Sequence, residues 1–592
     1  MPGRATLSGL PASPGIAVGR AWTVDRRKVR TPRRAVDAVD AAAEAERLES
    51  ALEASERQVQ EVRAKVARAE GAVEHLAIID VHLAMLRDPT LVDEARRLIR
   101  EERVNAEWAV KRAVRKIKGA FTTDDEFFRE RRADVDHVGE RIIKNLLGEG
   151  ADAEERPPEG SILVARDLSP ADTALFLHDR KVAGLVTDAG GVTSHTAIVA
   201  RALEIPAVVG AGRASSLIES GDWLVVDGNR GVVIRDPTPG ERADYAAARV
   251  AQQERDLELA RQKDLPAETS DGVTLGKVGN IEFAEEIPGL LQHGGEGIGL
   301  YRTEFLYIGR DELPTEEVQY REYRRILEAM GDRPVTVRTF DLGGDKLPSG
   351  QRDHAENPAL GLRAVRYCLR HPDLFRAQLR ALLRAAEHGN LRVMVPMVSG
   401  IAEVRAARRM LAEAREELRR EGVETRQPPF GVMVELPSAA LLADRLAAEV
   451  DFLSVGTNDL IQYTIGVDRQ NKDVAYLYKP LHLAVLRSLR FVCEAGRRAG
   501  VPVSMCGEMA GEPLYALVVL GLGFTELSMN GPSIPLVKRV IRSASAAAGR
   551  RLVERLLALT SADEIEREVR AEVARSFPGL IEGAAAVGPV SG

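Results

Sequence analysis

In the C-terminal half of the chain, short apolar runs alternate with longer stretches that are apolar on one helical face only. Such runs are typical of strands in a parallel sheet, because helices cover both faces of that sheet. Amphipathic helices are expected between them, for example at 316–330, 372–388 and 401–420. The eight runs are 275–281, 298–301, 335–339, 393–397, 431–436, 452–455, 501–505 and 526–529. Eight alternations of this kind predict a closed parallel (β/α)8 barrel.

Between about residues 36 and 147 the pattern is helical. Leu48, Leu52, Val59, Val62 and Val66 recur at spacings of three, four and seven, which places them on one face of a helix. Further helices are expected at 72–86, 89–101, 105–120 and 128–147, with no strand between them. This succession of amphipathic helices predicts a small helical bundle.

Strand-like segments lie on both sides of this helical block, between residues 7 and 24 and again at 161–165, 183–186, 207–209, 223–226 and 232–234. The block is therefore predicted to be an insertion into one discontinuous α/β domain. From residue 236 to residue 264 the sequence becomes rich in Ala, Glu, Arg and Gln, which favours a helical linker. The expected domains are 1–35 with 149–236 (α/β), 36–148 (helical insert), 237–264 (linker), 265–578 (barrel) and 579–592 (flexible tail).

The composition is that of an ordinary soluble globular protein. Of 592 residues, 45% are hydrophobic and 29% are charged, and the net charge of −7 gives no support for a nucleic-acid or anionic-membrane partner. No run of 18 apolar residues occurs, and the first residues lack the pattern of a signal peptide, so no membrane insertion is expected. The three cysteines have no metal-type spacing and cannot form a disulfide framework, which favours a cytoplasmic protein.

The strongest local signal for chemistry is the stretch DAGGVTSHTAIVAR at 188–201. It follows a predicted strand and leads into a predicted helix, 196–203, with Thr193 or Ser194 as the N-cap. His195 is therefore expected on a glycine-rich turn at a helix N-terminus, where free backbone N–H groups favour an anion. A histidine there is suited to accept a phosphoryl group. The alternative is a capping or packing histidine.

Polar side chains also gather just past the eight apolar runs. They include arginines that suit a phosphate or carboxylate, carboxylates that suit a hard cation such as Mg²⁺, and a thiol. In a closed parallel barrel these strand ends meet at one face, where active sites lie. A salt bridge or a strand-end turn explains any single member, but not suitable chemistry at so many strand ends. The residues are Arg302, Glu304, Arg338, Asp341, Glu435, Asn458, Asp459, Cys506, Glu508 and Asn530.

Several long motifs then carry a resemblance to a known family. The stretch TDAGGVTSHTAIVAR at 187–201 resembles the phosphohistidine signature of enzyme I of the phosphoenolpyruvate-dependent sugar phosphotransferase system. The match runs from about residue 7 to residue 578, and further motifs are GIGLYRTEFLY (297–307), RTFDLGGDK (338–346), GVMVELP (431–437), DFLSVGTNDLIQYTIGVD (451–468) and MCGE (505–508). The resemblance implies a swivelling phosphohistidine α/β domain, an inserted helical domain that binds the phosphocarrier protein HPr, and a dimeric TIM barrel that binds phosphoenolpyruvate.

The resemblance also implies roles for individual residues. His195 is similar to the family's phosphorylated histidine, Cys506 to the residue that protonates the enolate of pyruvate, and Thr173 to a hydroxyl partner of the imidazole. Glu435 and Asp459 resemble the Mg²⁺ ligands. The residues similar to those that hold the substrate are Arg302, Arg338, Lys346, Asn458 and Arg469.

Within the helical insert, the stretch VHLAMLRDPTL at 81–91 resembles the family's partner-binding helix junction. A Met and Leu patch near a carboxylate suits a small partner that presents an apolar spot among basic residues. A bundle that only stabilises the α/β domain is the alternative. The candidate contact residues are His82, Met85, Leu86, Asp88 and Leu91.

The implied function is transfer of the phosphoryl group of phosphoenolpyruvate to His195 and then to a histidine of HPr, with Mg²⁺ as cofactor and a homodimer formed through the barrel. Pyruvate phosphate dikinase and phosphoenolpyruvate synthase share these modules but carry an N-terminal nucleotide-binding domain, for which the residues before the first motif leave no room. A non-catalytic, phosphorylation-dependent regulator would be favoured by loss of His195, Arg338 or Cys506, and all three are present.

Overall fold

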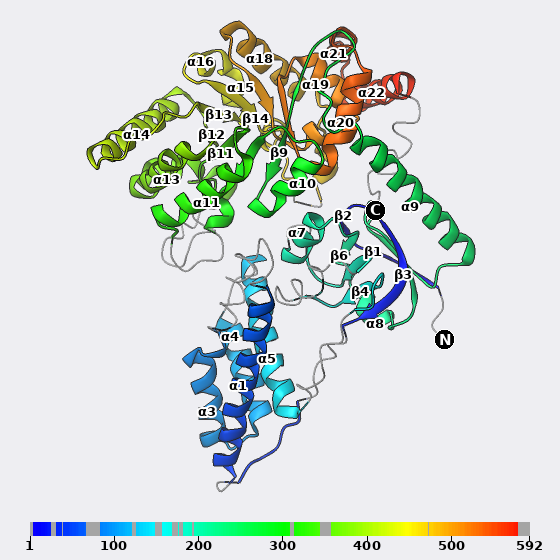
Figure 1. Cartoon of the computed structure of the whole chain (residues 1–592), viewed down its shortest axis with the longest axis vertical. Coiled ribbons are helices and arrows are strands. Elements are labelled where there is room, and N and C mark those ends of the chain that lie inside the picture. Colours follow the sequence, from blue (N-terminus) through cyan, green and yellow to red (C-terminus); the bar gives the residue numbers. More distant parts are fainter. Residues whose placement is uncertain are drawn as a thin grey trace. The chain divides into compact units, whose positions relative to one another are not determined.

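The computed structural model describes residues 4–24, 31–37, 40–66, 83, 85–120, 126–148, 157–168, 176, 182–191, 194–307, 313–343, 357–469, 471 and 473–577. The chain forms two compact units that divide between Glu254 and Arg255. Figure 1 labels many of the helices and strands of both units and colours the chain along the sequence.

The first unit contains a mixed sheet with the strand order β1-β8-β7-β3-β4-β5-β6-β2. Strands β3 to β6 run parallel to one another, and the remaining pairs are antiparallel. Because β3 pairs with β4 across the helical block of the sequence, the sheet is discontinuous in the chain, as predicted. The strands are β1 (Ala5–Ser8), β2 (Leu10–Ser13), β3 (Ile16–Thr23), β4 (Ile162–Ala165), β5 (Gly184–Thr187), β6 (Ala207–Val209), β7 (Trp223–Asp227) and β8 (Val232–Arg235).

Both faces of this sheet are buried, which explains why its parallel strands read as continuous apolar runs. Along β4, Leu163 packs into one hydrophobic cluster whereas Ile162 and Val164 pack into the other. Helix α7 (His195–Ala202) contributes Ala197 to the first cluster. The short helix α8 (Ala214–Leu217) contributes its first residue to the second. The two helices therefore cover opposite faces of the sheet (Figure 1).

The helical block forms the predicted bundle. Its described helices are α1 (Ala41–Val66), α3 (Pro89–Glu102), α4 (Ala106–Ala120) and α5 (Glu126–Leu147). The expected helix at 72–86 falls mostly outside the described residues. Leu48 and Val59 from the predicted stripe of α1 are buried in the bundle core, and Leu52 packs against that core. The apolar face of α1 was thus predicted correctly at these positions.

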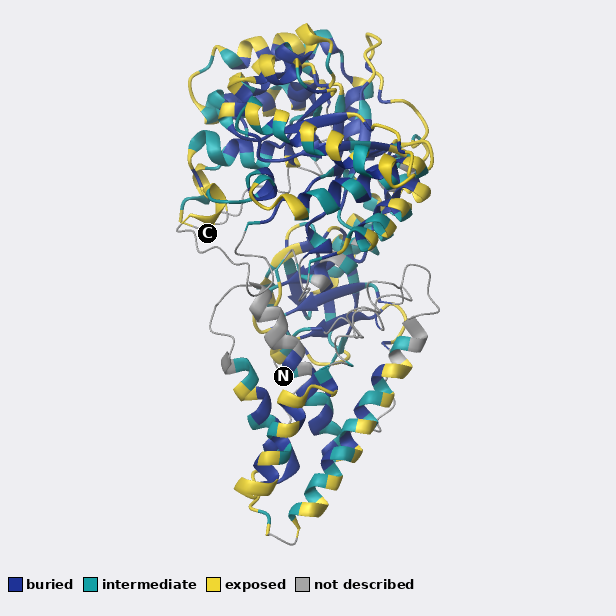
Figure 2. Ribbon diagram, turned by 90° about the vertical axis from the view of Figure 1, so that its left-hand side faces the viewer, coloured by how far each residue is buried: buried dark blue, intermediate teal, exposed yellow. Residues whose placement is uncertain are grey.

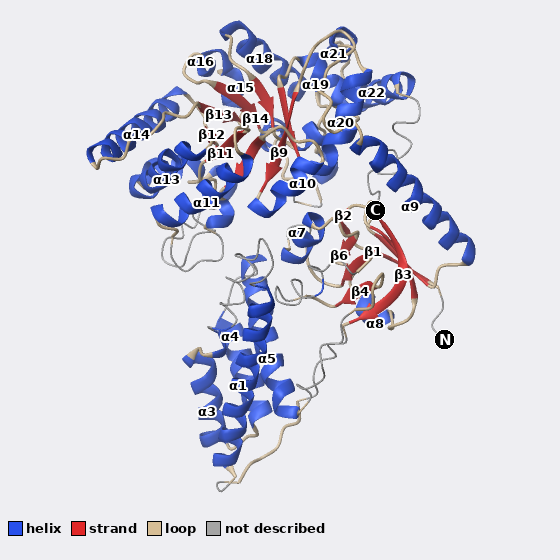
Figure 3. Ribbon diagram, viewed as in Figure 1, coloured by secondary structure: helices blue, strands red, loops and turns tan. Residues whose placement is uncertain are grey.

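The second unit is built around a closed barrel of eight parallel strands, in agreement with the sequence (Figure 3). Strand β16 pairs with β9 and closes the ring. The strands are β9 (Gly276–Ile281), β10 (Ile298–Arg302), β11 (Pro334–Arg338), β12 (Asn390–Val395), β13 (Phe430–Val434), β14 (Phe452–Val455), β15 (Val503–Met505) and β16 (Glu526–Met529).

Helices surround this barrel, and their apolar faces form one large core with the outer faces of the strands. Figure 2 shows the buried strands inside and the exposed positions on the outer surfaces of the helices. The helices are α10 (Ile287–Gln292), α11 (Glu316–Met330), α12 (Ala364–Arg370), α13 (Pro372–Ala385), α14 (Ile401–Arg420), α15 (Pro437–Leu441), α16 (Ala443–Ala447), α17 (Thr457–Ile465), α18 (Leu483–Ala499), α19 (Ala516–Leu522), α20 (Ile534–Ser543), α21 (Ala546–Leu557) and α22 (Ala562–Ser576).

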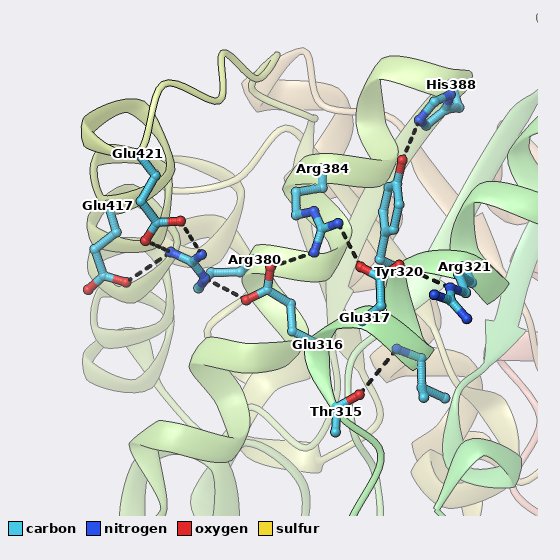
Figure 4. Close-up of polar contacts among 11 residues, drawn as sticks. Thr315, Glu316, Glu317, Tyr320, Arg321, Arg380, Arg384, His388, Glu417 and Glu421 are labelled. Atoms are coloured by element: carbon cyan, nitrogen blue, oxygen red, sulfur yellow. Dashed lines mark hydrogen bonds and ion pairs between the residues drawn. The ribbon is translucent and has the colours of Figure 1, made fainter.

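Three neighbouring outer helices, α11, α13 and α14, are linked by ion pairs (Figure 4). Arg380 on α13 contacts Glu316 of α11 at 2.6 Å and Glu421, just past α14, at 2.7 Å. Arg384 contacts both Glu316 and Glu317 at 2.8 Å. Because several charges share partners, this network holds the helices in register better than isolated surface pairs would.

The predicted linker at 237–264 contains helix α9 (Pro239–Ala260), and the division between the two units falls within it. None of the described helices is long and apolar enough to cross a membrane.

Candidate active site

The glycine-rich turn of the first unit leads from β5 into α7, as the sequence predicts. Gly190 has a φ of 97°, a left-handed conformation that residues with a side chain rarely adopt. Ser194 is the N-cap of α7, and its hydroxyl accepts a hydrogen bond from the N–H of Ala197 at 3.3 Å. His195 is the first residue of the helix. Its main chain therefore lies at the positive end of the helix dipole.

In the second unit, six of the residues expected from the sequence lie at the carboxyl ends of the barrel strands. Arg302 and Arg338 are the last residues of β10 and β11. Glu435 and Cys506 directly follow β13 and β15. Asn458 and Asp459 lie in the first turn of α17, after β14. Because the strands of the closed barrel are parallel, all these positions belong to the same end of the barrel.

Arg338 is held between two carboxylates. Its guanidinium lies 3.0 Å from Glu304 and 2.9 Å from Asp341. Burial by itself would lower the pKa of Arg338, but Glu304, Asp341 and Glu435 outweigh it and raise that pKa above its usual range. Arg338 is therefore a permanent cation in a fixed place. Arg302 is paired with Glu282 in the same region.

Arg363 also belongs to this group, and the sequence analysis missed it. Its guanidinium donates to Asp341 at 2.8 Å, so Asp341 bridges Arg363 and Arg338. Arg363 directly precedes α12 rather than following a strand, so the strand-end pattern gave no signal for it. In the part of the chain that the structure describes, Arg338 and Arg363 each have a buried Nε atom without a hydrogen-bond partner. Two such donors suit a bound anion.

Glu435 is a buried carboxyl group, 1% exposed. One of its oxygens accepts a hydrogen bond from the N–H of Met397 at 2.6 Å. The pKa of Glu435 is raised to about 8, mainly by burial and to a lesser extent by the nearby Asp341 and Asp459. Arg338 opposes this shift. A cation beside Glu435 and Asp459 would relieve the repulsion between the carboxylates, so these two residues fit a divalent metal ion.

The described ranges contain no group of three or more His, Cys, Asp or Glu side chains arranged to hold a metal ion. A metal at Glu435 and Asp459 would thus complete its coordination with ligands other than such side chains. Mg²⁺ commonly binds in this way, through one or two carboxylates together with substrate oxygens and water.

Cys506 is buried, 4% exposed, among Leu300, Met394, Met433 and Phe452. Its Sγ lies 3.6 Å from the carbonyl oxygen of Val455. Burial raises the pKa of Cys506 to about 11, and the nearby Ser454 opposes this shift. The thiol therefore carries its proton at neutral pH, which suits a proton donor and not a nucleophile.

The amide of Asn458 and the acidic residue Glu508 form a reciprocal pair. The Asn458 Nδ2 donates to the Glu508 carboxylate, and its Oδ1 accepts from the Glu508 N–H, both at 3.0 Å. Arg469 lies 3.6 Å from the same carboxylate. Asn458 is thereby oriented by a residue that follows the neighbouring strand, and Arg469 is brought close to it.

Three candidate residues, Thr173, Lys346 and His82, lie outside the described residues. In the bundle, Leu86 and Leu91 are 3% and 4% exposed and belong to the core, so their side chains offer no contact surface in this structure. Met85 is half-buried and packs against that core. Asp88 is the N-cap of α3, and its side chain accepts from the N–H of Thr90 at 2.7 Å.

A separate pocket of about 310 Å³ lies between α13, α14 and the segment that leads into β13, at the amino end of that strand. The side chains of Arg415 and Arg419, which line it, are already hydrogen-bonded to Gln427 and Glu416. This pocket therefore lies apart from the candidate active site, which is at the carboxyl ends of the strands.

Comparison with known proteins supports the class that this geometry indicates. The models of the N-terminal, mobile and PEP-binding domains of PEP-utilising enzymes match residues 8–131, 157–231 and 256–546. The chain is thus a PEP-utilising enzyme. It is 42% identical to the phosphoenolpyruvate-protein phosphotransferase of Geobacillus stearothermophilus, over 95% of this chain and 97% of that protein. The chain belongs to the phosphoenolpyruvate-protein phosphotransferase family.

Another curated relative and one solved structure are also similar to the chain. The phosphoenolpyruvate-protein phosphotransferase of Bacillus subtilis is 40% identical over 94% of this chain and 98% of that protein. A solution structure of an Enzyme I (nEIt) protein is 36% identical and covers 42% of this chain and 99% of its own, with a TM-score of 0.35.

Proposed function

We propose that this enzyme takes the phosphoryl group of phosphoenolpyruvate onto His195 and passes it to a histidine of the phosphocarrier protein HPr. The observation that carries the first half is the cluster at the barrel strand ends, where fixed arginines, a buried carboxyl group and a protonated thiol lie together. The choice of His195 as acceptor rests on its position at a helix N-terminus after a glycine turn. The onward transfer to a protein partner rests on the names of the relatives.

The arginines supply the positive charge that the substrate requires. Phosphoenolpyruvate carries about three negative charges, and phosphoryl transfer depends on charge neutralisation and in-line positioning. We propose that Arg302, Arg338, Lys346, Asn458 and Arg469 bind the substrate. Arg363 joins them, since its guanidinium is fixed by the same carboxylate as that of Arg338 and both keep an unused buried donor.

Cys506 would complete the reaction at the substrate. Transfer of the phosphoryl group to the imidazole of His195 breaks the bond between phosphorus and the enol oxygen and leaves the enolate of pyruvate. The Cys506 S–H bond then breaks, its proton bonds to carbon 3, and the electrons of the enolate form the ketone of pyruvate. The thiolate regains a proton from solvent. Thr173 is proposed as the hydroxyl partner of the imidazole.

Glu435 and Asp459 are the proposed ligands of Mg²⁺. Burial and the neighbouring carboxylates disfavour the charged form of Glu435, and a cation at this place would reverse that preference. When bound, Mg²⁺ neutralises charge on the substrate oxygens. The residues of the chain hold the substrate and move the proton.

The proposed domain boundaries are those expected from the sequence. Residues 1–35 and 149–236 carry the phosphohistidine, 36–148 bind HPr, 237–264 form the linker, 265–578 bind phosphoenolpyruvate and dimerise, and 579–592 form a tail. Because the histidine must meet first the barrel and then HPr, the helical linker would allow the α/β domain to approach the barrel and to leave it again. All three cysteines are free and buried, which fits a cytoplasmic location.

The test is incubation of the purified protein with radiolabelled phosphoenolpyruvate and Mg²⁺, with and without HPr. We expect acid-labile label on the protein, and its passage to HPr when HPr is added. The His195→Ala variant should take up no label while its circular dichroism spectrum stays that of the wild type. His293→Ala, which changes a histidine of the barrel unit, is the matched control and should label normally. Acid-labile label on the His195→Ala protein would contradict the proposal.

A further inference from the structure

Two polar side chains inside the barrel connect β9 and β16 to the residue that follows β15. The hydroxyl of Ser528 donates to Asn280 Oδ1 at 2.6 Å, and Asn280 Nδ2 donates to the main-chain carbonyl oxygen of Cys506 at 3.1 Å. A carbonyl oxygen can only accept, so the amide nitrogen of Asn280 must face Cys506. The amide oxygen is then left for the Ser528 hydroxyl, and all three groups are satisfied together.

The alternation of β9 places Asn280 in the barrel interior. A side chain at Gly279 would meet Leu290 of the surrounding helix α10 at 2.4 Å, so position 279 faces outward. Its neighbours along the strand therefore face inward. Ser528 also lies inside, where it is fully buried. A Cβ atom at Gly299 would come within 2.5 Å of the Ser528 hydroxyl, so this glycine provides the space that Ser528 occupies.

Cys506 lies where the ladder of β15 ends. The last paired residue of that strand is Met505, which aligns with Val455 on one side and Leu527 on the other. The N–H of Cys506 still donates to the Val455 carbonyl at 3.0 Å. Its own carbonyl group lies beyond the ladder, in a residue that is 4% exposed. Without Asn280, this buried carbonyl would lose its side-chain donor, and unpaired buried carbonyl groups are rare.

The residue after Cys506 is fixed as well. A Cβ atom at Gly507 would lie 1.8 Å from the Thr457 hydroxyl, so the chain there is in close contact with the start of α17. The main chain at Cys506 is thus held at its N–H by Val455, at its carbonyl by Asn280, and at the next residue by Thr457. Of these contacts, the hydrogen bond from Asn280 is the one that a side-chain substitution removes without changing the neighbouring strand.

We propose that Asn280, itself held by Ser528, is a positioning residue that fixes the main chain at Cys506 and so aims the thiol at the carbon atom to be protonated. This inference rests on the proposed role of Cys506 as proton donor. Proton transfer needs donor and acceptor at close range, and a displacement of about 1 Å can cost about 10²-fold in rate. Loss of the Asn280 bond should therefore affect the turnover step and leave substrate binding largely intact.

The test compares steady-state kinetics of the full-length wild type and the Asn280→Leu variant. We expect kcat to fall by about 10- to 100-fold, with the KM for phosphoenolpyruvate changed by less than about threefold. Thr525→Val is the matched control, because the Thr525 hydroxyl donates to the carbonyl of Val503 at the other end of β15, at 3.0 Å. This control should leave kcat unchanged. An unchanged kcat in Asn280→Leu, or equal changes in both variants, would overturn the proposal.

A double variant separates positioning from general destabilisation. If Asn280 acts through the thiol, Asn280→Leu should have little further effect on kcat in a Cys506→Ala background, whereas a merely structural role would lower kcat again by the same factor. The Cys506→Ala single variant also tests the proposed role of Cys506 as proton donor, on which this inference rests. If it turns over normally, the proton-donor role itself is wrong; if it is slow while Asn280→Leu is normal, only the role of Asn280 is wrong.

The Asn280→Asp variant covers the case in which Asn280→Leu does not fold. An ionised carboxylate would face the Cys506 carbonyl without a proton to donate, whereas a protonated one would restore the hydrogen bond. The kcat of Asn280→Asp relative to wild type should therefore rise as the pH is lowered. A ratio that is independent of pH would contradict the proposed hydrogen bond.

Discussion

At the scale of the residue, the candidate site consists of groups whose protonation is set by burial and by fixed neighbours. Cys506 is the clearest example, because its buried environment keeps the thiol protonated. The sequence showed a cysteine just past a predicted strand. The sequence could not show the surrounding apolar side chains or the carbonyl of Val455, since these come from other strands that meet only in the closed barrel.

Cys506→Ala should therefore slow turnover while leaving phosphoenolpyruvate binding nearly unchanged. A general acid contributes about 10²- to 10⁴-fold, and we expect a loss of kcat in this range. The measurement is kcat and the dissociation constant of phosphoenolpyruvate side by side. Cys493→Ala is the control, because Cys493 is equally buried but lies in α18, outside the strand-end cluster. Normal turnover of Cys506→Ala would return this thiol to a packing role.

Glu435→Gln should raise the Mg²⁺ concentration needed for half-maximal activity. The change keeps the shape of the side chain but removes the charge that would bind the cation. Loss of even an outer-shell partner commonly costs 10- to 100-fold in metal affinity, so we expect a shift of at least about tenfold.

The matched control is Glu526→Gln. Glu526 is also a largely buried carboxyl group of a barrel strand, but it lies at the amino end of β16 and pairs with Arg392. Its Mg²⁺ titration should overlay that of the wild type. If the Glu435→Gln titration does so too, the metal site lies elsewhere.

At the scale of the element, all eight barrel strands were predicted from apolar runs. Where a predicted strand boundary differs from the observed one, the difference has a local cause. The run 393–397 was expected to be one strand, but β12 ends at Val395, and Met397 has a φ of 55°. This turned main chain lets the N–H of Met397 donate to Glu435. A sequence pattern shows that a segment is apolar, but it does not show that a buried carboxylate just past the next strand needs a donor.

Helix α20 contains a buried lysine that the sequence analysis did not single out. Lys538 is 1% exposed, and its ammonium group donates to the carbonyl groups of Gln262 and Lys263, just past α9. The pKa of Lys538 is lowered to about 8, mainly by burial and to a lesser extent by the nearby Lys277 and Arg542. The carboxylates of Glu296 and Asp264 oppose this shift. The lysine thus joins the linker segment to the barrel at the cost of burying a charge.

This pKa gives a prediction about stability. Below about pH 8 Lys538 is charged in both the folded and the unfolded chain, so the cost of burying the charge is fully present. Between about pH 8 and 10.5 only the unfolded chain keeps the proton, and the stability that Lys538 contributes therefore rises with pH. The unfolding midpoint of the wild type relative to Lys538→Met should increase over this range.

The control is Lys479→Met, which removes a lysine whose side chain is 41% exposed. The difference in unfolding midpoint between the wild type and Lys479→Met should not rise with pH in this way, because an exposed ammonium group keeps its water on folding. A Lys538→Met difference that is constant between about pH 8 and 10.5 would show that the ammonium group is not penalised by burial.

At the scale of the whole molecule, the sequence predicted the α/β domain with its helical insert and the closed barrel, but only part of the candidate site. The strand-end rule found Arg338, Glu435 and Cys506, because a parallel barrel brings every carboxyl end to one face. It missed Arg363, whose place beside Asp341 depends on the fold of the segment before α12. Long-range partners of this kind are set by three-dimensional packing and leave no spacing pattern in the chain.

The helical bundle gives the last prediction, which concerns the partner protein. We proposed that residues 36–148 bind HPr, with a contact patch near residues 82–91. Since Leu86 and Leu91 belong to the bundle core, the part of the patch that a partner can reach is formed by half-buried Met85 and exposed Asp88. Met85→Asp should weaken phosphoryl transfer to HPr by about tenfold or more, on the order of 1.4 kcal/mol, because it places a charge in an apolar contact. Phosphorylation of His195 should persist, since the histidine and the barrel are unchanged.

The measurement is the rate of label transfer from the prephosphorylated variant to HPr, beside its rate of self-phosphorylation. Leu147→Asp is the matched control, because Leu147 is also half-buried against the bundle core. It lies at the opposite end of the bundle, where Arg47 joins the carbonyl of Leu146 to Glu107 at the start of α4. If both variants lose transfer equally, the effect arises from a loosened bundle and not from a lost contact. If Met85→Asp transfers its label normally, HPr binds to another surface of the chain.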